Sequence, residues 1–118
     1  SVGFTVWDHS DRRTIYLLNT DWASDQDQHP ATFIYKGKKF PVVVRRYHIE
    51  TIHCADGLAV MPASNTTDIL SVCKKENGWV VKVQTTGNDV VQCMNAVTGK
   101  VEPIKFDEPG VHEVFVNE

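Results

Sequence analysis

Apolar and polar residues alternate with a period of two through nearly the whole chain, and clusters of turn residues interrupt the alternation at short intervals. Successive side chains of a β-strand point to opposite faces of a sheet, so the alternation is typical of strands with one buried face. No window shows the apolar spacing of an amphipathic helix. The pattern predicts an all-β, antiparallel β-sandwich of about ten or eleven short strands, immunoglobulin-like or jelly-roll-like.

The turn residues predict how neighbouring strands pair. Gly37 stands in a short turn where a positive φ is wanted, and Asn77-Gly78 is the strongest hairpin signal in the chain. Pro41 has no backbone N–H to donate to a neighbouring strand, so it is expected at the start of a strand or at the edge of a sheet. The expected hairpins join 2–7 to 14–19, 32–35 to 40–45, 47–54 to 58–61, 69–73 to 79–84 and 90–95 to 101–106, with a last strand at 111–116. Residues 21–30 are expected to form a polar loop, and 61–68 to cross between the two sheets.

Composition limits the class of protein. The chain has 118 residues, of which 42% are hydrophobic and 23% charged, so we expect one soluble domain, residues 1–118, with its own core. A net charge of −3 argues against nucleic acid as a partner, and no apolar run approaches the roughly 18 residues of a membrane span. The chain starts at Ser1 inside a strand-like segment and shows no signal-peptide pattern, which suggests a piece excised from a longer protein.

The three cysteines, Cys54, Cys73 and Cys93, match no zinc-binding spacing and no dense disulfide framework. We expect them to be small buried hydrophobic residues, with one disulfide plus a free thiol as the alternative. They constrain the compartment weakly, and an extracellular or periplasmic location is favoured.

Two polar groups could in principle bind a metal ion. Asp25, Asp27 and His29 alternate in the polar loop, but the longer ligand list and the glycine of a calcium loop do not follow, so a solvated loop is favoured. His48 and Glu50 are expected on one face of a strand as a surface pair, while the following histidine, His53, turns to the other face. We therefore assign no metal and no cofactor.

No nucleophile elbow and no phosphate-binding glycine loop is present, so no catalytic residue is assigned and the isolated domain is not expected to be an enzyme. The aromatic side chains offer a different chemistry, because a flat ring matches the C–H face of a sugar. Trp22, Tyr35 and Tyr47 are the candidate ligand-binding residues, whereas Trp7 and Trp79 are expected to anchor the core.

Three stretches resemble C-terminal accessory β-sandwich domains of bacterial glycoside hydrolases. The first is RTIYLLNTDW at 13–22, in which a strand leads into a variable loop. The second is IYKGKKFPV at 34–42, where an apolar strand follows a Gly-Lys turn. The third is the ending, NAVTGKV at 95–101 and PGVHEVFV at 109–116, which is similar to the closing hairpin and last strand of such domains.

The resemblance implies a non-catalytic domain that packs on, or shapes the cleft of, a catalytic domain of the same parent chain, or helps it dimerise. No catalytic residue of those enzymes is carried over, because their catalytic motifs do not occur here. The alternatives are a stand-alone carbohydrate-binding module, with carbohydrate as its partner, and an immunoglobulin-like domain for adhesion or protein interaction. The accessory domain predicts an exposed apolar patch, and the carbohydrate-binding module predicts exposed coplanar aromatic rings.

Overall fold

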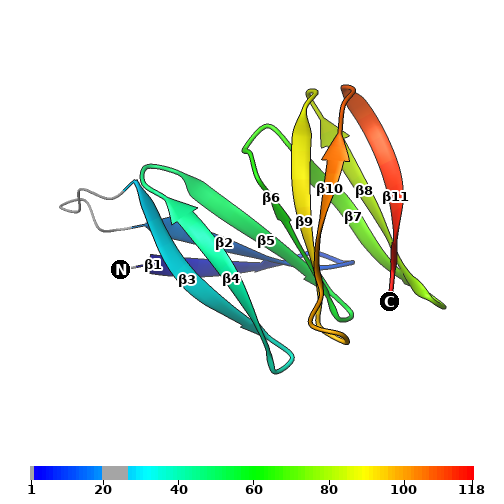
Figure 1. Cartoon of the computed structure of the whole chain (residues 1–118), viewed down its shortest axis with the longest axis horizontal. Helices are drawn as coiled ribbons and strands as arrows, with labels where there is room; N and C mark the ends of the chain where they lie inside the picture. The colour runs from blue at the N-terminus through cyan, green and yellow to red at the C-terminus, as the bar shows by residue number, and fades with distance from the viewer. Residues whose placement is uncertain (1, 20–26) are drawn as a thin grey trace.

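The computed structural model describes residues 2–19 and 27–118 of the chain. Within them there is no helix, and the expected all-β antiparallel sandwich is confirmed (Figure 1). The eleven strands are β1 (Val2–Asp8), β2 (Arg13–Asn19), β3 (Gln28–Tyr35), β4 (Lys38–Arg45), β5 (Ile49–Ala55), β6 (Leu58–Pro62), β7 (Asp68–Lys75), β8 (Gly78–Thr85), β9 (Asp89–Asn95), β10 (Val101–Phe106) and β11 (Gly110–Asn117). All five expected hairpins are present, and 61–68 contains the crossing from β6 to β7.

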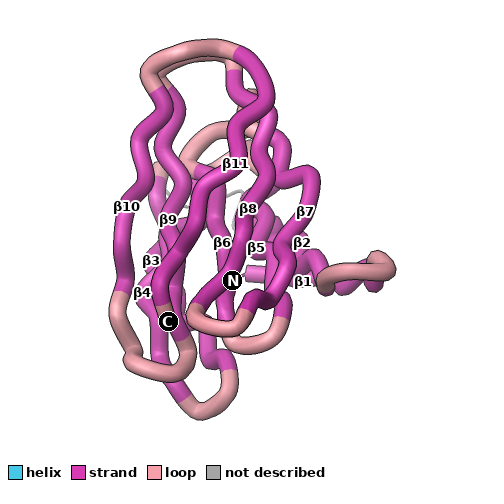
Figure 2. Tube along the Cα trace, turned by 90° about the vertical axis from the view of Figure 1, so that its right-hand side faces the viewer, coloured by secondary structure: helices cyan, strands magenta, loops and turns pink. Residues whose placement is uncertain are grey.

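A six-stranded sheet in the order β1-β2-β5-β6-β9-β10 forms the centre of the molecule. The three-stranded sheet β11-β8-β7 packs on one face of it, at the end formed by β6, β9 and β10 (Figures 1 and 2). The hairpin β3-β4 packs on the opposite face, nearer to β2 and β5. The protein is thus layered on both sides of the central sheet, but each layer covers only part of it.

Strand β6 lies where the two layers overlap, and all five of its residues are buried. Val60 belongs to the core under β11-β8-β7, whereas Ala59 and Met61 belong to the core under β3-β4. The largest side chain of the first core is Trp79, which is fully buried and donates its indole N–H to the carbonyl of Asp56 at 3.1 Å. Trp79 is therefore the core anchor that the sequence predicts.

Two hairpin turns have the geometry that their sequences predict. Lys36 and Gly37 have φ values of 48° and 79°, and Asp56 and Gly57 have 47° and 95°. Two successive positive φ values define the type I′ turn, whose twist matches that of the flanking strands. These turns connect β3 to β4 and β5 to β6.

Gly78 is required for a different reason from the one the sequence suggests. The β7-β8 turn consists of Glu76 and Asn77, and Gly78 already belongs to β8, opposite the end of β11. A Cβ atom at Gly78 would collide with the carbonyl of Val116 and the ring of Phe115. The glycine therefore allows two strands to approach closely.

Two burial predictions are wrong. Trp7 is 62% exposed, because β1 is an edge strand and the β11-β8-β7 layer does not cover the face on which Trp7 lies. Cys73 is exposed, because the register of β7 shifts between Ile69 and Ser71. That bulge turns both Ile69 and Val72 into the core and moves Cys73 to the outside.

The ends of two elements also differ from expectation. Strand β3 begins at Gln28, so the expected polar loop loses its last three residues to the sheet. Tyr47 and His48 lie in the turn before β5 and not in the strand itself, which begins at Ile49.

Candidate interaction surface

Exposed apolar side chains gather where the central sheet extends beyond the β11-β8-β7 layer. Pairing of β1 with β2 and of β2 with β5 brings four of them onto one face, with Thr5 opposite Tyr16 and Leu18 opposite Ile49. The four side chains, which we call the sheet-end patch, are Trp7, Tyr16, Leu18 and Ile49. Contiguous exposed apolar surface is typical of interaction sites in soluble proteins.

The other face of the same strands forms an apolar groove against β3. This β1-β3 groove has a volume of about 330 Å³, and Ile15 and Leu17 of β2 form part of its floor. Its rims expose Phe4, which is 72% accessible, and Ile34, which is 62% accessible. The end of the sandwich is therefore open and apolar on both faces of β1.

Arg12 fixes this end of the sheet to β7. Its guanidinium donates from Nη2 to the carbonyl of Ile69 at 2.9 Å and from Nη1 to the carbonyl of Leu70 at 3.2 Å. The neighbouring Asp11 accepts the backbone N–H of Val72 at 3.1 Å and pairs with Arg12 at 2.9 Å. The β1-β2 turn is thus held by side chains that occupy the free edge of β7.

His53 is buried beneath Arg12. Arg12 Nε donates to His53 Nδ1 at 3.2 Å, so Nδ1 must be the unprotonated ring nitrogen. The proton is then on Nε2, which lies 3.2 Å from Thr51 Oγ1 and donates to it. Burial, and next the positive charge of Arg12, lower the pKa of His53 to about 4. His53 is therefore a neutral structural side chain near pH 7.

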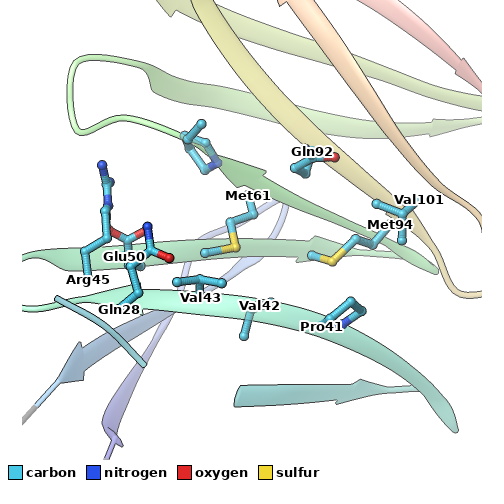
Figure 3. A pocket seen from close by; sticks show the side chains of 12 residues that line it. Gln28, Pro41, Val42, Val43, Arg45, Glu50, Met61, Gln92, Met94 and Val101 are labelled. Carbon is cyan, nitrogen blue, oxygen red and sulfur yellow. Dashed lines mark hydrogen bonds and ion pairs between the residues drawn. The ribbon is translucent and has the colours of Figure 1, made fainter. Parts of the chain in front are cut away.

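A second cavity, of about 460 Å³, lies between β4 and the β6-β9-β10 part of the sheet (Figure 3). Met61 and Met94 line its middle, and Arg45 and Glu50 stand together at one end. Arg45 donates from Nε and Nη2 to the same oxygen of the buried Glu50 carboxylate, at 3.0 and 2.8 Å. Because the two charged side chains of the lining, Arg45 and Glu50, pair with each other, a ligand in this cavity would meet mainly apolar side chains.

The predicted ligand-binding residues do not come together. The hydroxyl of Tyr35 accepts the N–H of Gly57 at 3.1 Å, and burial raises the pKa of Tyr35. Tyr47 is 66% exposed, has a φ of 65°, and lies under the guanidinium of Arg46 at 5.2 Å. The two tyrosines flank opposite ends of β4, and the third candidate, Trp22, lies outside the described residues.

The predicted surface pair of His48 and Glu50 is wrong. His48 is exposed and its Nδ1 lies 2.9 Å from the carbonyl of Arg46, whereas Glu50 is buried against Arg45. The expectation that His53 faces away from Glu50 is confirmed, since each packs on a different side of β5. In the described part of the chain, no three histidine, cysteine or carboxylate side chains lie close enough to hold a metal ion.

The remaining predicted polar residues have structural contacts. Asp27 is exposed and pairs with Arg46 at 2.8 Å, and His29 lies within β3; Asp25 is outside the described residues.

All three cysteines are free, which excludes the alternative of one disulfide. Burial raises the pKa of Cys54 and of Cys93 to about 12, so both remain thiols.

Comparisons of this chain with known protein families, with curated proteins and with solved structures find no match. Over the residues that the structure describes, no helix has the length and apolarity needed to cross a membrane.

Sequence reasoning missed the sheet-end patch. Alternation predicts that one face of β2 is buried, and it does not reveal that the outer layer stops before reaching Tyr16 and Leu18. A usable signal was present in β1, where Phe4 and Val6 alternate with Trp7, so that large apolar side chains occur on both faces. A strand of this kind has either two packed faces or an interface.

Proposed function

We propose that this chain is a non-catalytic accessory domain of a bacterial carbohydrate-active enzyme, which packs on, or shapes the cleft of, a catalytic domain outside this chain. The observation that carries the proposal is the sheet-end patch. The resemblance of 13–22, 34–42, 95–101 and 109–116 to accessory domains of glycoside hydrolases supplies the type of parent enzyme.

The composition of the patch fits a packed interface between domains. Aromatic side chains are enriched and charged ones depleted at the centre of such interfaces. Trp7 and Tyr16 supply two aromatic rings, Leu18 and Ile49 supply aliphatic surface, and none of the four is charged. The side chains project from a hydrogen-bonded sheet whose turn Arg12 holds in place, so little ordering is needed on binding.

The test begins with the complete reading frame that contains this chain, which must also encode a glycoside hydrolase domain. The catalytic domain and this domain are then produced separately and their binding is measured by calorimetry. Replacing Trp7 and Leu18 by serine should weaken binding by about tenfold or more. Val111→Ser, at an exposed position on the distant β11, is the matched control and should leave binding unchanged.

Two outcomes would overturn this proposal. One is a reading frame without a carbohydrate-active catalytic domain. The other is a pair of folded domains that show no association and no effect of this domain on the activity or thermal stability of the catalytic domain.

A carbohydrate-binding module is the second candidate, and one observation favours it. Trp7 and Tyr16 are diagonal neighbours on one face of β1 and β2, close enough to offer two rings to one oligosaccharide. Binding of a panel of polysaccharides to the isolated domain, followed by intrinsic fluorescence, tests this candidate. Saturable binding that Trp7→Ala removes from a folded protein would favour it over domain packing.

A further inference from the structure

The sheets of this protein end in edge strands, and most of these edges carry a feature that blocks further pairing. An unpaired edge exposes N–H and C=O groups that can take up another strand, and natural proteins protect such edges with proline, charge or bulges. Pro103 lies in β10, Pro30 in β3 and Pro41 in β4. Each of these prolines falls at a position of its hairpin where the nitrogen points away from the partner strand.

The edges of β7 and β11 are protected in other ways. Strand β7 has the bulge between Ile69 and Ser71, and the side chains of Asp11 and Arg12 occupy backbone groups along its edge. Strand β11 carries the exposed charge of Glu113 near its centre. These features leave β1 as the contrasting case.

Strand β1 has the sequence VGFTVWD, without proline or lysine. Its only charged residue is Asp8 at the end, which is engaged with Arg13 of the same hairpin at 2.7 Å. It pairs with β2 in continuous register from Val2 to Asp8, with no bulge. Strand β1 is therefore a regular and largely apolar edge of seven residues, and among the described residues no strand pairs with its outer side.

The β1-β2 turn determines which backbone N–H and C=O groups of β1 face β2 and which face the open edge. His9 donates its N–H to the carbonyl of Arg12 at 2.8 Å, so hydrogen-bonded and non-hydrogen-bonded pairs alternate from that point. Trp7, Thr5 and Gly3 then direct their backbone groups toward β2. The groups of Val2, Phe4, Val6 and Asp8 point to the open edge.

We propose that the open edge of β1 pairs with β1 of a second copy of this chain, antiparallel and about a twofold axis at Thr5. This is the register in which every outward-pointing residue meets an outward-pointing residue of the partner. The resulting cross-strand pairs are Val2 with Asp8, Gly3 with Trp7, Phe4 with Val6, and Thr5 with Thr5.

The side chains that meet in this register are complementary. Phe4 and Val6 form an aromatic pair with a β-branched residue, and the two Thr5 hydroxyls meet at the axis. The Trp7 ring lies beside Gly3, where an open backbone can accept an aromatic neighbour. No two like charges face each other, because Asp8 is opposite Val2.

A twofold axis perpendicular to a sheet keeps each face on its own side. The β1-β3 grooves of the two copies therefore open toward one another, and the exposed Phe4 and Ile34 of each copy approach the same seam. The interface would cover apolar surface that the single chain leaves in water. The two central sheets become one continuous sheet across the seam, and Tyr16, Leu18 and Ile49 of the sheet-end patch remain exposed on the opposite face.

The experiment measures the mass of the isolated domain by sedimentation equilibrium at concentrations up to about 1 mM. The wild-type domain should be a dimer at the upper end of this range. Thr5→Lys and Thr5→Glu each place two like charges directly opposite at the axis, and each should weaken the dimer by about tenfold or more. An equimolar mixture of the two variants should regain a dimer that contains one copy of each.

Val6→Pro tests the backbone pairing separately. It removes an N–H that points to the open edge and leaves the β1-β2 hydrogen bonds intact, so the variant should fold and be monomeric. Val111→Pro makes the same change at an outward position of β11 and should remain dimeric. Circular dichroism checks the fold of each variant, and the Thr5 variants decide the matter if Val6→Pro does not fold.

A domain that stays monomeric at about 1 mM would overturn the proposal and leave the edge to a strand of another protein. A dimer that both Thr5 variants leave unchanged would also overturn it, since the copies would then meet elsewhere. These results are independent of the reading frame, so they separate failure of the dimer from failure of the proposed accessory role.

Discussion

At the scale of single residues, the neutral imidazole of His53 gives the fold a pH dependence. Its pKa is about 4 in the folded protein against 6.5 in an unfolded chain, because burial and Arg12 disfavour the charged form. The unfolded state therefore binds more protons between these two pH values, and stability is full above pH 6.5 and falls as the pH drops toward 4.

The expected loss is about 3 kcal/mol of unfolding free energy across this interval. Urea denaturation at a series of pH values from 6.5 down to 4 measures this loss of unfolding free energy. The His53→Gln variant has no imidazole at this position and should lack this part of the pH dependence. Titration of the His53 ring by NMR supplies an independent check. A ring that titrates near its ordinary value, or a variant with the full pH dependence, would contradict the assignment.

Gly78 gives a second prediction at this scale. Gly78→Ala places a methyl group against the Val116 carbonyl and the Phe115 ring, and overpacking of this kind should cost about 1–3 kcal/mol. Gly37→Ala is the matched control, because a methyl group there meets open space and pays only for the positive φ, about 1 kcal/mol. Thermal unfolding of both variants compares them, and an equal cost would argue against the close approach of β8 and β11.

At the scale of strands and turns, the sequence predicts some features of the structure and not others. The turns at Gly37 and Gly57 were predictable, because a positive φ is a local requirement with a recognisable sequence. The exposure of Cys73 was not, because a single bulge after Ile69 reverses the alternation that follows it. The burial of Glu50 was also out of reach, since its partner Arg45 comes from another sheet.

The docking of the β1-β2 turn on β7 can be tested through two neighbouring arginines. Arg12→Ala should destabilise the protein by about 2–4 kcal/mol, because it removes the donor to two carbonyls of β7 and one of the two donors within reach of the buried His53 ring. Arg13 forms an exposed pair with Asp8, so Arg13→Ala should produce no measurable change. Chemical denaturation of both variants measures the difference, and similar curves would show that the Arg12 contacts do not anchor the turn.

At the scale of the whole molecule, the sequence predicts the fold class but not the arrangement of its layers. Alternation shows that each strand has an apolar face, and this is enough for a sandwich. It does not show that β6 is covered on both faces while the face of β1 that carries Trp7 is left exposed, which is why Trp7 was expected inside. The sheet-end patch is exposed because the β11-β8-β7 layer ends before reaching it, and the alternation within a single strand does not reveal where a neighbouring layer ends.

Because β6 contributes residues to both cores, we expect the two cores to unfold as one cooperative unit. Phe40→Ala under β3-β4 should cost about 3–5 kcal/mol, and Leu58→Ala under β11-β8-β7 about 2–5 kcal/mol. Each substitution should accelerate the slowest amide hydrogen exchange in both cores to the same extent. Faster exchange confined to β3 and β4 in the Phe40→Ala variant would show that the hairpin opens on its own.

The positions of the two chain ends have a mechanical consequence. Strand β1 runs along the long axis of the molecule, whereas β11 runs across that axis toward the C-terminal end (Figure 1). Tension between the ends would load the β1-β2 hydrogen bonds in shear, all at once. The same tension would peel β11 from β8 one pair at a time. When force is applied between the two ends, the hydrogen bonds between β8 and β11 should therefore break first, while those between β1 and β2 remain intact.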